Sequence, residues 1–214
     1  MSGRMIVLDK HPGVRPVGVG ETWRHIFAKI VLNFMGLEPT MACQDDQICA
    51  GLKALIYDAI HGVQALWDEN SSMEEWVFLL VDAKNTINDI NQVGMLWTVR
   101  HLWPSGASFL FNCYFHWSLL VLRNGNGTAS NLHIREGVTQ GGPLAMALYG
   151  IGIPPLINHL TRAIPGVTHT WYANNAGDLG TFVRLETYFD LLTPQGPGLG
   201  YHPKPSNILL IVRQ

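Results

Sequence analysis

The stretch Trp171-Tyr172-Ala173-Asn174-Asn175-Ala176 constrains the fold more than any other part of this sequence. An aromatic residue, a small residue and two similar polar residues follow one another, with apolar residues before them and turn-forming residues after them. This order is typical of the tip of a β-hairpin, in which a tight turn joins two antiparallel strands. The stretch therefore predicts a hairpin that begins near Val167.

Two further segments precede this hairpin and carry their own signals. In the first, an apolar run over residues 75–81 ends at Asp82, which predicts a strand buried on both faces with a carboxylate at its edge. The second, over residues 135–144, is rich in glycine and ends in Pro143-Leu144. Glycine lets a backbone approach a ligand closely and proline suits the first turn of a helix, so this segment predicts a loop that enters a helix.

In this order, the three segments resemble the palm of a reverse transcriptase, in which the hairpin reads Tyr-Ala-Asp-Asp. Arg15-Pro16-Val17 is similar to a strand of the fingers in that family. The resemblance extends from Arg15 to Val212 and is nearest to the reverse transcriptases of non-LTR retrotransposons. It implies an α+β right-hand polymerase fold, with partial fingers and a connecting helix over residues 1–75, an antiparallel palm sheet with backing helices over residues 76–214, and no thumb.

Apolar periodicity and turn residues predict the remaining elements. Residues 1–20 are expected to form strands and turns, and residues 42–69 one long helix in which Asp45 and Asp46 complement the dipole of the first turn. A helix from Pro143 is expected to be kinked at Pro154-Pro155. Further expected elements are helices over residues 21–35, 93–102 and 184–192, a turn between antiparallel strands at residues 124–127, and a last strand over residues 208–212.

The resemblance implies that Asp82, Asn174 and Asn175 occupy the catalytic positions. In the family, three aspartates at these positions hold two Mg²⁺ ions, which activate the attacking 3′-hydroxyl and neutralise the phosphate. Here Asp82 is the metal ligand that the resemblance implies, and the two asparagines bring no charge to the site. This predicts weak Mg²⁺ binding and impaired or absent activity. Asp178 lies nearby in the sequence, but the family gives it no catalytic role.

The resemblance also implies contacts to nucleotide and template. Gln140 can donate or accept hydrogen bonds at a base or sugar, and Ile87 stands where the family has an aromatic residue that excludes a 2′-hydroxyl. Arg24 and Lys29, both on the predicted helix over residues 21–35, each fit either a triphosphate contact or a solvated helix face. The implied contact residues are Ile87, Gln140, Gly141, Pro143, Arg15 and Arg24. Departures from the family are Gly142 for aspartate, Thr86 for alanine and Asn207 for lysine, with Lys204 close to it.

Composition bounds the class of protein. Of 214 residues, 47% are hydrophobic and 14% are charged, which excludes a disordered tail and suggests uncovered apolar faces. The formal net charge of −2 lacks the basic excess usual in an autonomous nucleic-acid binder. The three cysteines have no zinc-site spacing, and the sequence shows neither a signal peptide nor a membrane span. A soluble, intracellular protein without a membrane partner is expected.

Several functions stay open at this point. The first is an RNA-directed DNA polymerase that uses an RNA template, a DNA primer and deoxynucleoside triphosphates. The second is a decayed retroelement copy that keeps the fold without the activity, and the third is an inactive nucleic-acid-binding or structural module adopted from a retroelement. An unrelated enzyme that pairs His101, His116 or His133 with a carboxylate is a further alternative.

Overall fold

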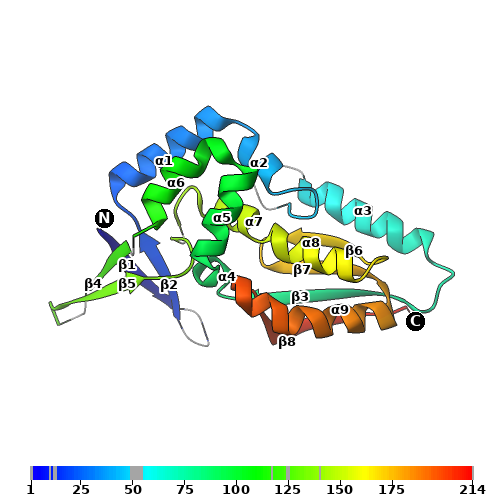
Figure 1. The fold of residues 1–214 in the computed structure, drawn as a ribbon. Helices are drawn as coiled ribbons and strands as arrows, with labels where there is room; N and C mark the ends of the chain where they lie inside the picture. Colours follow the sequence, from blue (N-terminus) through cyan, green and yellow to red (C-terminus); the bar gives the residue numbers. More distant parts are fainter. Residues whose placement is uncertain are drawn as a thin grey trace.

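Two four-stranded β-sheets organise the computed structural model, which describes residues 2–9, 11, 14–48, 55–116, 118–123, 126–139 and 141–213. Figure 1 shows the two sheets lying apart, with helices between and above them. The mixed α+β class that the sequence predicts is therefore confirmed. In the part of the chain that the structure describes, no helix combines the length and the apolar character needed to cross a membrane.

The first sheet has the strand order β2-β1-β4-β5. β1 pairs antiparallel with β2 and parallel with β4, and β4 pairs antiparallel with β5 across the turn that the sequence predicts. The parallel pairing joins strands that lie far apart in the sequence, and no local sequence pattern predicts it. The strands of this sheet are β1 (Ser2–Asp9), β2 (Val14–Val19), β4 (Ser118–Arg123) and β5 (Ala129–Ile134).

The second sheet has the order β6-β7-β3-β8, and all of its pairings are antiparallel. β6 and β7 form the predicted hairpin, and β7 places Asn175 opposite Asp82 on β3. β8 lies at the edge of the sheet and begins with a segment that contains Pro203 and Pro205. The strands are β3 (Trp76–Lys84), β6 (Thr168–Tyr172), β7 (Asn175–Thr181) and β8 (His202–Ile211).

The helices begin and end largely where capping residues and prolines allow. Asn91 caps α5, since its side chain accepts a 2.9 Å hydrogen bond from the backbone N–H of Gly94, and Pro104 opens α6. The helices are α1 (Thr22–Met35), α2 (Glu38–Ala42), α3 (Leu55–Glu69), α4 (Thr86–Asp89), α5 (Gln92–Leu102), α6 (Pro104–Tyr114), α7 (Ala145–Gly152), α8 (Pro154–Ala163) and α9 (Phe182–Gln195), followed by the short 3₁₀ helix η1 (Gly196–Leu199).

Two helix predictions were wrong. Residues 42–69 do not form one helix, because α2 ends at Ala42 and residues 45–46 form a turn before a one-residue bridge at Gln47. Asp46 therefore belongs to a turn rather than to the start of a helix. The helix predicted from Pro143 begins at Ala145 and ends at Gly152, and Pro154 starts a separate helix instead of kinking the first.

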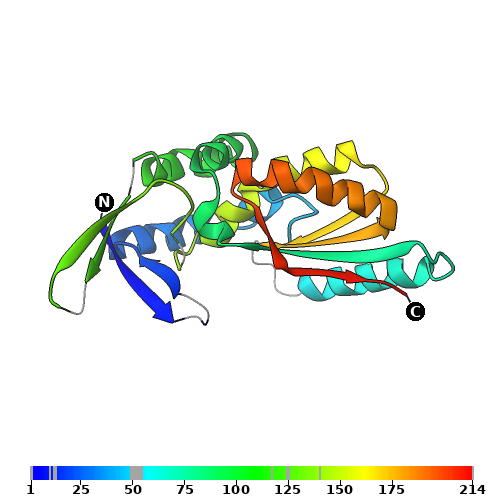
Figure 2. The ribbon, with the colours of Figure 1, turned by 90° about the horizontal axis from the view of Figure 1, so that it is seen from below.

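The strand β3 is buried on one face only, which corrects the prediction of burial on both faces. Its side chains alternate, with Val77, Leu79 and Val81 buried and the residues between them partly exposed. Figure 2 shows α8 and α9 on one side of this sheet and α3 on the other. The helix α9 packs directly on β7 and β3, α5 packs on α6 and α7, and α7 reaches the sheet through the core cluster around Trp171.

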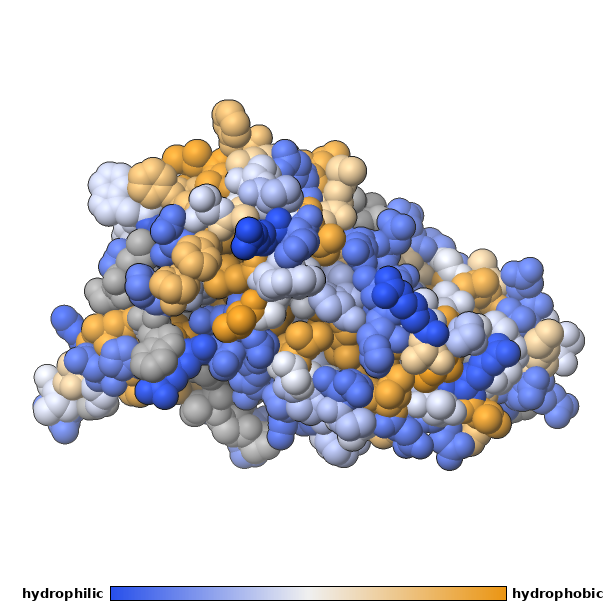
Figure 3. Space-filling model, in the orientation of Figure 1, coloured by the Kyte–Doolittle hydropathy of each residue, from blue (hydrophilic) through white to orange (hydrophobic). Residues whose placement is uncertain are grey.

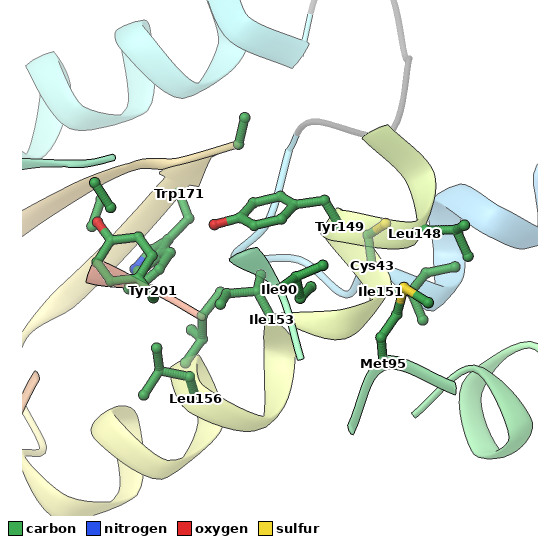
Figure 4. Close-up of a cluster of buried hydrophobic side chains, with 14 of the residues drawn as sticks. Cys43, Ile90, Met95, Leu148, Tyr149, Ile151, Ile153, Leu156, Trp171 and Tyr201 are labelled. Atoms are coloured by element: carbon green, nitrogen blue, oxygen red, sulfur yellow. The ribbon is translucent and has the colours of Figure 1, made fainter. Parts of the chain in front are cut away.

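The buried core joins the second sheet to the helices around α7. Trp171 of β6 and Tyr201 lie with their ring centroids 4.9 Å apart, and Tyr149 of α7 extends towards them (Figure 4). Ile90 and Ile153 fill the space beneath these rings. Burying a large apolar side chain contributes about 1.5–3 kcal/mol, so this cluster fixes β6 against α7 and against the start of β8.

The helix α1 carries an apolar face that the described residues leave uncovered. Its inner face packs through Ala28, Val31 and Met35, but Trp23 is 70% exposed and Phe34 is 86% exposed. Apolar surface is visible over α1 and α6 in Figure 3. The expectation of uncovered apolar faces is thus confirmed for α1.

Gly200 offers a test of this packing. Its φ is +85°, and an added Cβ would collide with the backbone carbonyl oxygen of Asp89. We expect Gly200→Ala to lower the free energy of unfolding by about 3 kcal/mol, because neither the backbone conformation nor a backbone atom can give way cheaply. The neighbouring Gly198 has open space around it, so Gly198→Ala is the control and should change stability by less than about 0.5 kcal/mol in urea denaturation. Equal losses for the two variants would contradict this account.

Candidate active site

The carboxylate of Asp82 is the centre of the candidate site. It lies near the end of β3, half-buried, and the side chains of two asparagines from different segments converge on it. Nδ2 of Asn174 donates a hydrogen bond to Oδ1 of Asp82, and Nδ2 of Asn207 donates to Oδ2 at 2.7 Å. The sequence therefore predicted correctly that Asp82 and the hairpin tip lie together, and the structure adds Asn207 from β8.

Both oxygens of this carboxylate accept from neutral amide donors. The opposite orientation of either amide would set its carbonyl oxygen against the negative carboxylate, so electrostatics fixes the N–H groups of Asn174 and Asn207 towards Asp82. Asn174 Nδ2 also donates to the carbonyl oxygen of Ala83 at 3.1 Å. The amides thus compensate the charge of Asp82 from within the protein.

The hairpin tip is held to β3 through its backbone as well. The hydroxyl of Tyr201 donates to the carbonyl oxygens of Val81, at 3.0 Å, and of Asn174, at 3.2 Å. Burial raises the pKa of Tyr201 well above its ordinary value, and Tyr149 and nearby carboxylates raise it further, so the hydroxyl keeps its proton and stays a donor. The sequence did not predict this role of Tyr201, although the residue stands out as the aromatic side chain directly before β8.

The pairing of β3 with β8 shifts register between Val81 and Ala83, because Val81 pairs with Ile208 and Ala83 with Pro203. Residues 204–207 of β8 therefore lie in the interrupted stretch beside Asp82, and one of them, Asn207, reaches the carboxylate. Lys204, which lies close in the sequence to the position of the family lysine at Asn207, is also on β8.

Asp178 belongs to a different environment and does not join the site. It pairs with Leu79, whose side chain is buried. Leu79 lies three positions before Asp82 on the strand, so the two carboxylates lie on opposite faces of the sheet. Asp178 is 0% exposed, and its Oδ1 lies 2.7 Å from Nδ1 of His169. Burial raises the pKa of Asp178, and the hydrogen bond with His169 lowers it.

The loop over residues 135–144 is anchored to α4 and to the start of α5. The carbonyl oxygen of Ile87 accepts from the backbone N–H of Val138 at 2.7 Å, and Gln92 Nε2 donates to the carbonyl oxygen of Gly137 at 2.7 Å. Ile87 is partly buried and packs against the core. The structure thus brings the predicted residue Ile87 to the start of the loop, whereas Gln140 lies outside the described residues.

Further along, the loop meets β2 and α1. Gly141 has a φ of +94° and faces Val17 of β2, close enough that an added Cβ would lie 3.5 Å from a methyl group of that valine. Arg15 lies on the same strand, but its side chain lies outside the described part. Pro143 lines a small pocket together with Arg24.

Arg24 contacts an aromatic ring that its place in the sequence does not indicate. Its guanidinium carbon lies 4.4 Å from the centroid of the Tyr114 ring, between α1 and α6, so the cation is engaged with an aromatic face of the protein. Burial raises the pKa of Tyr114, and this effect outweighs the guanidinium of Arg24, which favours the charged tyrosinate and lowers the pKa. Lys29, by contrast, is exposed.

Two of the three candidate histidines contact aromatic neighbours. His101 packs at a tilt on Trp97 with ring centroids 4.1 Å apart, and His116 packs edge-on against Phe115, whereas His133 lies exposed on β5. The His–carboxylate pair that the structure does contain, His169 with Asp178, was missed. Among the described residues, no group of three or more potential ligands of the types His, Cys, Asp and Glu could hold a metal ion.

Comparisons with known proteins bear on the fold. No protein-family model and no curated protein matches the chain. Among solved structures, apo telomerase of Candida tropicalis truncated from its C-terminal domain matches with a TM-score of 0.76 and 11% identity, over 100% of this chain and 50% of that one. Telomerase of Candida albicans in complex with a fragment of telomeric RNA matches with a TM-score of 0.70 and 10% identity, over 100% and 43%.

The chain has a reverse-transcriptase-like polymerase fold. A third match, telomerase of Candida tropicalis in complex with a fragment of telomeric RNA, has a TM-score of 0.74 at 12% identity over 98% of this chain and 41% of that one. The chain therefore spans half or less of the length of these telomerase chains. At such low identity the likeness concerns the fold alone.

Asn174 provides a direct test of the contact with Asp82. We expect Asn174→Asp to lower the free energy of unfolding by about 2 kcal/mol in EDTA, because it removes a donor to Asp82 and sets a second negative charge beside it. Mg²⁺ should restore part of this loss in the variant and leave the unmodified chain unchanged. Denaturant titrations with EDTA and with Mg²⁺ measure both effects.

Asn175→Asp is the matched control, since Asn175 is exposed and is paired with Asp82 through the strand backbone. Its loss of stability should be smaller. Equal losses for the two variants in EDTA would show that the contact between Asn174 and Asp82 contributes nothing specific.

Proposed function

We propose that this chain is a reverse-transcriptase domain of the non-LTR retrotransposon type that has lost most or all of its polymerase activity. The fold supports the reverse-transcriptase part, and the order of the three sequence segments supports the retrotransposon type. In this proposal the β6-β7-β3-β8 sheet is the palm. The fingers comprise β1, β2 and α1, and we add β4 and β5 to them because they share the sheet of β1.

The chemistry of the site carries the proposal of lost activity. Template-directed DNA synthesis by two-metal phosphoryl transfer requires several carboxylate oxygens that converge on a pair of Mg²⁺ ions. In this chain the two oxygens of Asp82 face the N–H groups of Asn174 and Asn207, which repel a cation, and Asp178 is on the other face of the sheet. The described residues therefore do not fit a pair of Mg²⁺ ions, and we derive no catalytic step through them.

Primer extension tests this proposal. With an RNA template, a DNA primer, deoxynucleoside triphosphates and Mg²⁺, we expect the unmodified chain to extend no primer, because the charge that holds the metal ions is missing. Titration calorimetry should show weak Mg²⁺ binding that becomes at least about tenfold tighter in the Asn174→Asp, Asn175→Asp double variant. Adding Asp82→Asn to the double variant is the control and should remove the gain. Extension by the unmodified chain that Asp82→Ala abolishes would contradict the proposal.

A second candidate function is an inactive nucleic-acid-binding module. The observation that favours it is that two of the similar telomerase structures are complexes with RNA. In this reading the template and primer are ligands without being substrates. Exposed cations near the proposed fingers, such as Lys29 of α1, would contact phosphate groups, whereas the engaged guanidinium of Arg24 would not.

A salt titration of RNA binding separates the two candidates. The binding module predicts an affinity that falls steeply with salt and a slope that becomes shallower by about one when Lys29 is changed to glutamate. Arg162 is also exposed, but it belongs to α8, which lies against the second sheet and not against the proposed fingers (Figure 2). Arg162→Glu is therefore the matched control and should leave the slope unchanged. Weak binding without this difference favours the decayed polymerase.

A further inference from the structure

Gln47 occupies a buried position beside the hairpin, on a segment that is distant in the sequence. It is 2% exposed and forms a one-residue parallel bridge with Trp171 of β6. The backbone N–H of Ile48 donates to the carbonyl oxygen of Trp171 at 2.9 Å, and the N–H of Trp171 donates to the carbonyl oxygen of Asp46 at 2.8 Å. The segment 46–48 thus extends the sheet at the edge of β6.

The side chain of Gln47 binds both polar backbone groups of one residue in the hairpin tip. Its Oε1 accepts from the N–H of Ala173 at 3.0 Å, and its Nε2 donates to the carbonyl oxygen of Ala173 at 3.3 Å. Two hydrogen bonds from one planar amide fix the orientation of Ala173 as well as its distance from Gln47. Because the site is buried, no water can replace either partner without rearrangement.

Ala173 needs such support because its backbone is unusual. Its φ is +51°, in the left-handed region that residues with a Cβ rarely adopt. The next residue is Asn174, whose side chain reaches Asp82 and whose carbonyl oxygen accepts from the N–H of Ala83 at 3.3 Å. The conformation of Ala173 therefore decides whether the side chain at position 174 faces β3.

We propose that Gln47 is a positioning residue for the candidate active site. It holds Ala173 in the left-handed conformation and thereby directs the side chain of residue 174 onto Asp82. The proposal goes beyond the proposed function, since it assigns a role to a residue that neither the family resemblance nor the sequence motifs single out. It rests on hydrogen bonds of the chain as it stands and does not require polymerase activity.

A matched pair of buried glutamines separates positioning from general stability. Gln92 is also buried, and its Nε2 donates at 2.7 Å to the carbonyl oxygen of Gly137, away from the hairpin tip. Gln47→Met and Gln92→Met each remove a buried amide and keep an unbranched side chain of similar length. Any effect at the hairpin that appears only in Gln47→Met is therefore specific to the clamp on Ala173.

The measurement is solution NMR of the full chain. In Gln47→Met, we expect the N–H of Ala173 to exchange with solvent about tenfold faster and the side-chain NH₂ resonances of Asn174 to move to those of a free amide. Asn207 donates its side-chain N–H to the other oxygen of Asp82 at 2.7 Å, and its NH₂ resonances should stay in place. Gln92→Met should change none of these signals, even at an equal loss of thermal stability.

Gln47→Glu keeps the proposal testable if the methionine variant does not fold. It retains one acceptor for the N–H of Ala173 and loses the donor to the carbonyl oxygen, so the same resonances of Asn174 should shift partway. Unchanged resonances of Asn174 in a folded Gln47 variant, or the same shifts in Gln92→Met, would overturn the proposal.

A further arm links the residue to the proposed function. In the Asn174→Asp, Asn175→Asp background, Gln47→Met should weaken Mg²⁺ binding several-fold while Gln92→Met should not. If that background binds no Mg²⁺ at all, the proposed function fails, and the NMR arm still decides the role of Gln47.

Discussion

The arrangement of the whole second sheet depends on the strand β3, which lies between β7 and β8. Its alternating side chains face two environments, because Val77, Leu79 and Val81 are buried while Asp82 is only half-buried. The apolar face fixes the register of β3 under α9, and a shift by one residue would bury the carboxylate. The same packing that stabilises the core therefore presents Asp82 beside the hairpin tip.

Much of this could be predicted from the sequence because the signals are local. The turn chemistry of Ala173-Asn174 and the apolar run before Asp82 each depend on neighbouring residues, and hairpin strands pair without long loop closure. The helix α9 also followed from its periodicity. The resemblance to the reverse-transcriptase palm predicted that Asp82 and the hairpin tip lie together, and the register of β7 on β3 confirms this proximity.

What escaped prediction depends on contacts between distant segments. The clamp of Gln47 on Ala173, the hydroxyl of Tyr201 on the hairpin and the parallel pairing of β1 with β4 leave no local pattern. The break after Ala42 was missed because apolar residues continue at helical spacing beyond it, and the bridge of Gln47 with Trp171 competes successfully with helix formation. The contact of Arg24 with Tyr114 also leaves no local pattern, since only the fold brings the two residues together.

The edge position of β8 affects how the chain behaves while it folds. Pro203 and Pro205 lack backbone N–H groups, so the first half of this strand is a poor template for another strand. The second half, from Asn207 to Ile211, has neither proline nor charge, and Leu209 is 61% exposed. An exposed edge of this kind can pair with a strand of another molecule, and such pairing between molecules competes with correct folding. Because docking on β3 leaves the other edge of β8 unpaired, these five residues are where association between molecules is expected to begin.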